Sequence, residues 1–231
     1  MRTSRFLERV DLVEGVASFR FERPKGYAYE PGQYFDVRLE AVRDGRDVER
    51  FTISCAPGDA YLEFTTRLSG SAYKTALQAL PEGGAVAVSD AAGRLVVPPG
   101  ELETGFLLGG IGITPARSIL RDAAQRGTGL SATLFYGSRD ASSVAFRNEL
   151  DAYETGGAGV RVVHVLAAPS PGWAGETGFI TAEMVRRHVN DPSRLWWAVS
   201  GPPAMVAAMR TVLDDLRVPP DRAAFEFFAG Y

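Results

Sequence analysis

The sequence predicts a two-domain protein of mixed β and α/β class. An N-terminal antiparallel Greek-key β-barrel is followed by a Rossmann-like domain with a parallel sheet. Up to about residue 98, apolar and polar residues mostly alternate, as in strands with one buried face. Beyond it, fully apolar runs alternate with helical periods, as parallel strands buried on both faces require. The Pro-Pro-Gly run at 98–100 separates the two patterns, so we expect domains at 1–98 and 99–231.

Several short strands and one short helix make up the first domain. Turn pairs such as Pro31-Gly32 and Gly83-Gly84 separate the strands. The helix is expected over 71–80 and stops at Pro81. Many short strands with little helix are typical of a small antiparallel barrel. The expected strands cover 15–24, 32–40, 49–54, 60–68 and 85–89.

Four strand–helix units in succession predict the doubly wound α/β domain. Each unit pairs an apolar run with an amphipathic stretch, and no internal repeat is visible. The strands are expected at 105–110, 132–138, 160–166 and 195–201, and the helices at 114–126, 145–153, 181–189 and 204–216.

Composition and charge exclude several classes of function. The formal net charge of −3 gives no indication of nucleic-acid binding. No apolar run is long enough for membrane insertion, and the first residues lack the apolar centre of a signal peptide, so we expect a cytoplasmic protein. Cys55 is the only cysteine and there are two histidines. A disulfide within the chain and a four-cysteine metal centre are therefore excluded, and no metal site is expected.

A glycine-rich turn joins the first apolar strand of the second domain to a helix, in the sequence LLGGIGITPARSIL (107–120). Gly110 and Gly112 allow the main chain to approach a ligand closely. Thr114 is suited to cap the helix and Pro115 to occupy its first position. Free N–H groups and the helix dipole then favour an anion such as a pyrophosphate. Taken alone, the motif fits a tight packing turn equally well, because it lacks the third glycine of the dinucleotide fingerprint.

Further motifs accompany this turn in a characteristic order. They are YEPGQYFDVRL (29–39), ERFTISCAP (49–57) and SGSAYKTAL (69–77) before the turn, and SGPPAM (200–205) and EFFAGY (226–231) after it. With the glycine-rich turn, they resemble the ferredoxin–NADP reductase superfamily over nearly the whole chain. The resemblance implies a barrel that binds flavin and an α/β domain that binds NAD(P)H.

The resemblance assigns the flavin phosphates to the segment 69–77. It favours FAD over FMN, because this segment is similar to the diphosphate-binding form. Gly70 and Ser71 supply hydrogen-bond donors, and anionic phosphate also needs a cation. Arg50 is the first candidate for that cation, with Arg67 and Lys74 as alternatives, and for Lys74 a solvated surface position is nearly as plausible. The family arginine stands two positions before the aromatic residue, where this chain has Glu49, so the choice between Arg50 and Arg67 stays open.

The same resemblance places the flavin ring next to 51–53. Phe51 would pack against the ring unless it is a core aromatic, Thr52 would bring a hydroxyl to the reactive nitrogen, and Ile53 completes the segment. Tyr231 would cover the flavin face and move aside for the nicotinamide. Glu226 fits either a supporting position or a plain surface carboxylate.

On the nicotinamide side, the resemblance places Ser200, Gly201 and Pro202 beside the transfer site. Ser200 stands where many relatives have cysteine, and direct hydride transfer depends more on alignment than on a protein acid or base. Ser138 and Arg139, at the end of the second strand, favour the 2′-phosphate of NADPH. Asp140 follows at once, so NADPH and NADH both remain open.

We therefore expect a flavin-dependent oxidoreductase that passes hydride from NAD(P)H to bound FAD and electrons to a separate acceptor. The expected acceptor is a ferredoxin, a flavodoxin or an oxygenase component. Three alternatives remain: an electron-transfer subunit of a stable enzyme complex, a reductase of free flavin, and a non-catalytic flavin or nucleotide sensor.

Overall fold

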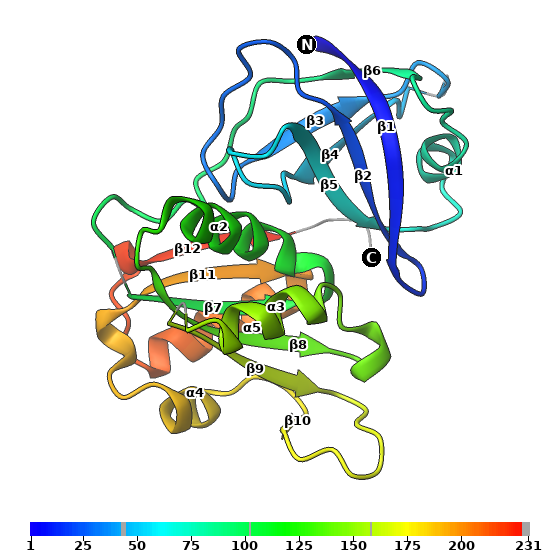
Figure 1. The fold of residues 1–231 in the computed structure, drawn as a ribbon. Helices are drawn as coiled ribbons and strands as arrows, with labels where there is room; N and C mark the ends of the chain where they lie inside the picture. Colours follow the sequence, from blue (N-terminus) through cyan, green and yellow to red (C-terminus); the bar gives the residue numbers. More distant parts are fainter. Residues whose placement is uncertain (43–44, 102, 158, 228–231) are drawn as a thin grey trace.

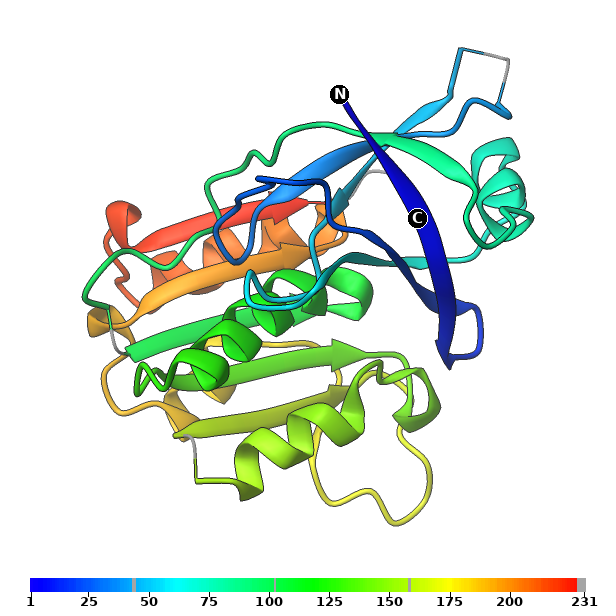
Figure 2. The ribbon, with the colours of Figure 1, turned by 45° about the horizontal axis from the view of Figure 1, so that its top comes forward.

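The computed structural model describes residues 1–42, 45–101, 103–157 and 159–227. The barrel lies on top of the α/β half, and helix α2 (Ile113–Arg126) lies between the barrel and the parallel sheet (Figures 1 and 2). The strand–helix alternation in the second half and the mainly β first half confirm the predicted fold class.

Six antiparallel strands in the order β4-β3-β6-β1-β2-β5 form the barrel. The outer strands of this order are β4 and β5. An isolated antiparallel bridge between Ile53, which follows β4, and Phe64, on β5, closes the barrel. The sequence pattern misses β1, because charged residues occupy most of its exposed face. The elements are β1 (Arg2–Val13), β2 (Val16–Glu22), β3 (Tyr34–Arg38), β4 (Val48–Thr52), β5 (Tyr61–Arg67), α1 (Ala72–Gln78) and β6 (Ala85–Val88).

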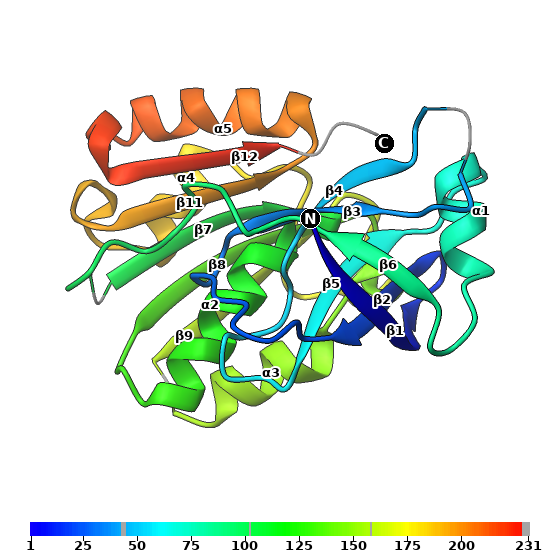
Figure 3. The same cartoon turned by 90° about the horizontal axis from the view of Figure 1, so that it is seen from above.

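The α/β half contains a parallel sheet in the order β10-β9-β8-β7-β11-β12. Helices α2 and α3 pack on one face of this sheet, and α4 and α5 pack on the other (Figure 3). Its strands are β7 (Glu103–Gly109), β8 (Ser131–Ser138), β9 (Val160–Leu166), β10 (Glu176–Thr177), β11 (Trp196–Gly201) and β12 (Ala223–Phe227); its other helices are α3 (Arg147–Thr155), α4 (Ala182–His188) and α5 (Pro203–Asp215).

From β7 the chain builds the sheet first to one side, through β8 and β9, and later to the other side, through β11 and β12. In open α/β sheets, ligands bind at the carboxyl ends of the strands near the point where the direction changes. Gly109 ends β7, and a 3₁₀ turn over Gly110–Gly112 leads from it into α2. The topology therefore puts the glycine-rich turn at the expected ligand edge of the sheet.

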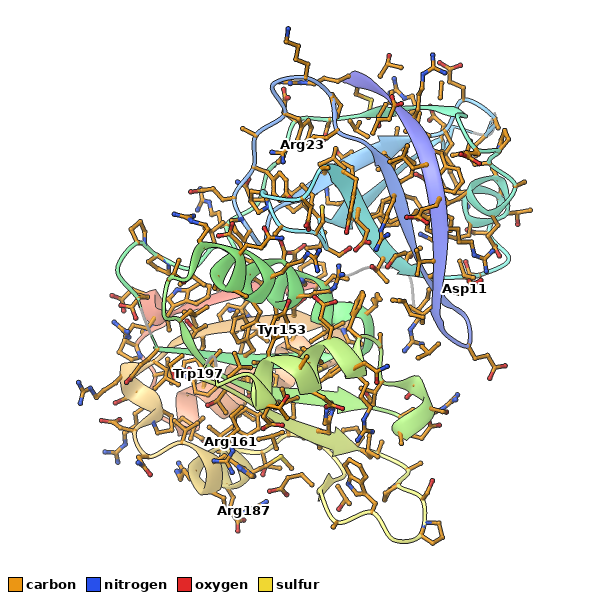
Figure 4. All side chains as sticks on the ribbon, viewed as in Figure 1. Asp11, Arg23, Tyr153, Arg161, Arg187 and Trp197 are labelled. Atoms are coloured by element: carbon orange, nitrogen blue, oxygen red, sulfur yellow. The ribbon has the colours of Figure 1, made fainter. Side chains whose placement is uncertain are left out.

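The two halves have separate cores that differ in character. Stacked phenylalanines fill the barrel, with Phe64 packed against Phe19 and Phe21 at centroid distances of 5.6 and 5.5 Å. In the α/β half, Trp197 (Figure 4) is fully buried and its ring lies beside that of Phe135 at a centroid distance of 6.4 Å. Leu95 and Leu12, from the first half of the chain, pack with the α/β core. Side chains from both sides of the predicted boundary at 98 thus share one core.

Candidate functional site

A cleft of about 880 Å³ opens where the barrel meets the glycine-rich turn and β12. The barrel supplies most of its wall, from β3, β4, β5 and the start of α1, and the α/β half supplies the rest. The lining residues are Tyr34, Asp36, Val48, Glu49, Arg50, Phe51, Thr52, Thr65, Thr66, Arg67, Ser69, Ser71, Lys74, Ile111, Thr114, Phe225, Glu226 and Phe227.

Successive residues of β4 point to opposite sides, which divides the predicted flavin segment into two groups. Arg50 lies opposite Asp36 on β3, with 2.8 Å between its Nε and a carboxylate oxygen, and its guanidinium covers the ring of Tyr34 at 4.3 Å. The bond to Asp36 raises the pKa of Arg50. Phe51 points the other way and stacks on Phe64 at 3.9 Å inside the barrel core. The structure therefore gives Phe51 a core packing role in addition to its place in the cleft wall.

An ion pair between buried Lys74 and half-buried Glu49 occupies the α1 end of the cleft. Lys74 places its Nζ 2.8 Å from a carboxylate oxygen of Glu49 and donates to the hydroxyl of Thr66 at 2.9 Å. Its side chain is only 10% exposed, and this burial lowers its pKa despite the pull of Glu49. Ser71 caps α1 by accepting from the Lys74 backbone N–H. Lys74 is thus a buried cation of the cleft and not a solvated surface residue.

Arg67 lies where the barrel approaches the glycine-rich turn. A side chain at Gly110 would bring its Cβ within 3.1 Å of the Arg67 guanidinium, and Gly110 has a left-handed φ of 53°. A larger residue at this position would be strained and would crowd Arg67. Arg67 and Arg50 both line the cleft, but only Arg67 lies against the predicted pyrophosphate turn.

Thr52 and Glu226 join the two halves of the molecule across the cleft. The Thr52 hydroxyl donates to a carboxylate oxygen of Glu226 at 3.0 Å, although 174 positions separate the two residues. Burial raises the pKa of Glu226 to about 7, while the Thr52 hydrogen bond and the charge of Arg50 oppose the shift. A carboxyl group that titrates near neutrality beside a buried hydroxyl can hold or release a proton at working pH.

The glycine-rich turn is pressed against β11 and α5. A Cβ at Gly112 would collide with the Ser200 carbonyl oxygen, and one at Gly109 would collide with the Met205 sulfur. At Gly112 the neighbour is main chain, so packing within the protein requires glycine there, whereas at Gly109 the neighbour is the flexible Met205 side chain. The turn, β11 and the start of α5 form a single packed unit at the carboxyl edge of the sheet.

Comparison with known proteins identifies the family. The family model for the oxidoreductase NAD-binding domain matches residues 106–211. Ferredoxin–NADP reductase B of Sorangium cellulosum is 30% identical over 195 residues, which cover 82% of this chain and 77% of that protein. The chain belongs to the ferredoxin–NADP reductase superfamily. It is therefore an oxidoreductase, as the sequence predicts.

Other relatives of this reductase agree with the assignment. NADH-cytochrome b5 reductase 1 of Aspergillus terreus is 28% identical over 225 residues, covering 90% of this chain and 75% of that protein. The crystal structure of an Amycolatopsis cytochrome P450 reductase superposes with a TM-score of 0.85 at 24% identity, covering 99% of this chain and 70% of that one. The crystal structure of the cytochrome b5 reductase domain of Ulva prolifera nitrate reductase also superposes with a TM-score of 0.85. The identity is 18%, and the match covers 97% of this chain and 96% of that one.

The start of α2 in this reductase differs from the prediction. Thr114 does not cap the helix and Pro115 is not its first residue, because the 3₁₀ turn runs directly into α2, which begins at Ile113. The Thr114 hydroxyl instead donates to the Ile111 carbonyl at 3.0 Å. Both predicted helix-start roles are wrong, while Thr114 still lines the cleft.

The remaining predicted residues of the reductase divide into buried and exposed positions. Ser200 is fully buried, and its hydroxyl has no hydrogen-bond partner among the described residues. Gly201 packs against Gly109, and Pro202 precedes α5. Gly70 is exposed with open space around it. Tyr231 lies outside the described residues.

The end of β8 carries the residues expected to distinguish NADPH from NADH. Ser138 is buried, and the Arg139 Nε lies 2.8 Å from a carboxylate oxygen of Asp140. Hydrogen bonds from Ser142 and then Arg139 lower the pKa of Asp140 to about 2. Asp140 also accepts from the Ser143 backbone N–H at 3.0 Å. Arg139 is therefore already paired with a fixed carboxylate.

Two residues carry more weight in the structure than the sequence indicated. The pattern is compatible with a supporting or a surface position for Glu226, whereas in the structure this residue is half-buried and hydrogen-bonded to Thr52. The sequence pattern does not indicate a role for Arg117, which lies in the N-terminal half of α2 with a side chain that is only 5% exposed. Helical periodicity gives no signal for Arg117, because its partners come from distant segments.

Of the described residues, no group of three or more metal-ligating side chains comes together, and no helix among them has the length and apolar character needed to cross a membrane.

Proposed function

We propose that this reductase transfers hydride from NAD(P)H to FAD held in the cleft and passes electrons to a separate protein acceptor. The observation that carries the proposal is the Thr52–Glu226 hydrogen bond, which brings the barrel and the α/β half together beside the glycine-rich turn. The acceptor we propose is a ferredoxin, a flavodoxin or an oxygenase component. Relatives named for ferredoxin and for cytochrome b5, together with the superposed cytochrome P450 reductase, support a protein acceptor.

The cleft residues suit a long anionic group with an aromatic ring. Lys74, Ser69 and Ser71 gather at one end of the wall, where phosphate would find a cation and hydroxyl donors. Tyr34 and Thr52, on the neighbouring strands, would border the ring. When bound, FAD accepts a hydride and releases electrons singly to an acceptor. Binding the phosphates would require Lys74 to share its charge between them and Glu49.

The chain's own contribution near the ring is proton handling. Glu226, with a pKa of about 7, would hold a proton below neutral pH and release it above. The Thr52 hydroxyl, 3.0 Å from that carboxylate, would relay the proton toward the cleft. Arg50 would limit the rise in the pKa of Glu226 through its positive charge.

On the dinucleotide side, Gly110 and Gly112 would receive the pyrophosphate at the carboxyl edge of β7. Gly201 and Pro202 would border the nicotinamide. Ser200 lies directly under the turn, with its carbonyl oxygen against Gly112. A change at Ser200 would then act on the position of the turn, not on a group that touches the dinucleotide.

For the dinucleotide, the ion pair at the end of β8 favours NADH. The sequence favours NADPH through Arg139, but a 2′-phosphate would have to compete with Asp140 for that guanidinium. It would also approach a carboxylate that stays ionised far below neutral pH. An Asp140→Asn substitution should therefore raise kcat/KM for NADPH relative to NADH, and an unchanged ratio would contradict this choice.

The deciding experiment is the visible spectrum of the purified protein, followed by anaerobic titration with NADH and, separately, NADPH. We expect a yellow protein that one of the dinucleotides bleaches. A protein that neither retains nor takes up FAD or FMN would overturn the flavin assignment. Bound flavin that neither dinucleotide reduces would support the sensor alternative instead.

A further inference from the structure

Arg117 is a buried cation between the two halves of the molecule. Its guanidinium donates to the Ser54 carbonyl at 2.7 Å and to the Glu63 carboxylate, both in the barrel half, and to Glu149 on α3 at 2.8 Å. Glu63 is only 1% exposed and also accepts from Arg20 at 2.8 Å. Arginine cannot discharge by losing its proton, so a buried arginine must have such partners. This cluster therefore exists only when both halves are docked.

The same face of α2 is hydrogen-bonded to the segment that follows β4. The Ser118 hydroxyl donates to the Cys55 carbonyl at 2.6 Å. One turn later, Arg121 donates to both carboxylate oxygens of Asp59, at 2.7 and 3.0 Å. Together with Arg117, these bonds attach α2 to residues 54–59 of the barrel half along more than one turn.

Arg117 is close in sequence to the dinucleotide turn, and its partner Ser54 is close to the flavin segment. Gly112 immediately precedes α2, and Arg117 follows it by five positions. Thr52 ends β4, and Ser54 follows it by two positions. The turn itself is packed against β11 at Ser200. The Arg117–Ser54 bond thus links the glycine-rich turn to the flavin side of the cleft through short stretches of ordered chain.

A strained residue helps to hold the guanidinium in place. Phe146 has a left-handed φ of 60°, which is unfavourable for a bulky side chain. Its ring covers the Arg117 guanidinium at 4.3 Å. Backbone strain of this kind persists where the surrounding structure enforces it. Arg117 is therefore fixed by carboxylates, a carbonyl and a ring at once.

We propose that Arg117 is a positioning residue for hydride transfer, which sets the spacing between the glycine-rich turn and the flavin cleft. The proposal rests on the proposed function. Transfer between two bound cofactors requires close alignment, and a displacement of about 1 Å can lower the rate by about 100-fold. A shift of α2 against the barrel would misalign the cofactors while leaving the barrel side of the cleft wall and the glycine-rich turn each intact.

The test compares flavin-loaded Arg117→Lys and a double variant, Arg117→Met with Glu63→Gln, with the wild type. The lysine variant keeps the charge but loses the planar fork that serves several acceptors. The double variant removes the Arg117–Glu63 pair as a unit. Glu149 keeps Arg121 at 3.7 Å and the Tyr153 hydroxyl at 2.9 Å, and Arg20 keeps Glu8 at 2.7 Å, so the other charged groups of the cluster still have partners. Arg126→Met is the matched control, because Arg126 lies on the same helix but is 69% exposed. Anaerobic rapid mixing with NADH and with NADPH measures the rate of flavin reduction against dinucleotide concentration.

At saturating dinucleotide we expect a rate at least about ten-fold lower in the double variant, a smaller loss in Arg117→Lys, and no change in Arg126→Met. The apparent Kd for the dinucleotide should change little. The long-wavelength absorbance of stacked nicotinamide and flavin should weaken in step with the rate. Arg117 variants that melt at lower temperature but react within two-fold of the wild type, with this absorbance intact, would overturn the proposal. A wild type that neither dinucleotide reduces would overturn the proposed function, and this role with it.

Discussion

Among the contacts that join the barrel to the α/β half, two place carboxylates in opposite electrostatic surroundings. Along α2, the carboxylates of Glu63 and Asp59 each form an ion pair with an arginine of the helix. Across the cleft, the carboxyl of Glu226 has a hydroxyl as its hydrogen-bond partner, and its pKa rises to about 7. A fully paired charge keeps its ionised form and fixes geometry, whereas a weakly paired one can exchange protons at neutral pH. The first contact is thus suited to holding the halves in place and the second to chemistry.

The largest effect on the rate is expected at the glycine-rich turn. This turn packs against Ser200, which lies opposite Glu226 in the β11–β12 pair, and it leads into the helix that carries Arg117. Gly112→Ala would force a Cβ into the Ser200 carbonyl oxygen. We expect flavin reduction to slow by about 100-fold and the free energy of unfolding to fall by about 3 kcal/mol. Gly137→Ala is the control, because its Cβ would make an ordinary 3.4 Å contact with the Leu108 carbonyl oxygen. Similar rates and urea midpoints for the two variants would contradict the packing role of Gly112.

The next effect is a pH dependence that belongs to the cleft contact. Burial raises the pKa of Glu226 from 4.5 to about 7. Between these two pH values, folding therefore favours the protonated carboxyl group, whereas the unfolded chain carries the carboxylate. The free energy of unfolding should therefore decrease as pH rises from about 4.5 to 7, by about 2–3 kcal/mol. Urea unfolding at pH 5 and pH 8 should show this loss in the wild type and not in Glu226→Gln. A matching loss in the variant would assign the titration to another group.

A smaller effect on rate is expected at Thr52. Thr52→Ala removes the hydroxyl that donates to Glu226 and should slow flavin reduction by about ten-fold. Thr52→Ser keeps the hydroxyl and should retain most of the rate. Stopped-flow reduction at saturating dinucleotide separates the two variants. An equal loss in both would show that the methyl group of Thr52, not its hydroxyl, is what the site needs.

The smallest effect is expected at Asp59, because its partner Arg121 lies farther along α2 from the turn than Arg117 does. Burial opposes ionisation of Asp59, but hydrogen bonds from Arg121 and the Ala56 N–H leave its pKa below 3.8. Its stabilising effect is therefore present above pH 3.8 and is lost as pH falls through the lower folded value. Asp59→Asn should lower the free energy of unfolding by about 1 kcal/mol at pH 6 and by less at pH 3, as measured by urea unfolding, with an unchanged rate of flavin reduction. A slower rate in this variant would remove the distinction between the two contacts.

The fold was predictable from the sequence because hydrophobic periodicity distinguishes half-buried from fully buried strands. The glycine-rich turn was also predictable as a feature, but the first residue of α2 was not, because the 3₁₀ turn that precedes Thr114 has no clear sequence signature. Partners distant in sequence explain the other gaps. Buried Lys74 pairs with Glu49, and buried Arg117 pairs with Glu63. A local sequence pattern cannot indicate these contacts, because the partners are distant in sequence.

Leu12 and Leu95 tie the barrel to the other half in a further way. Both belong to the first 98 residues, yet both pack with the core that α2 and α3 form on the parallel sheet. Melting of the α/β core should therefore also loosen the first strand of the barrel and the connection that leads out of it. The two lobes should unfold in a single cooperative transition, and fragments cut at residue 98 would each expose apolar surface that the intact chain covers.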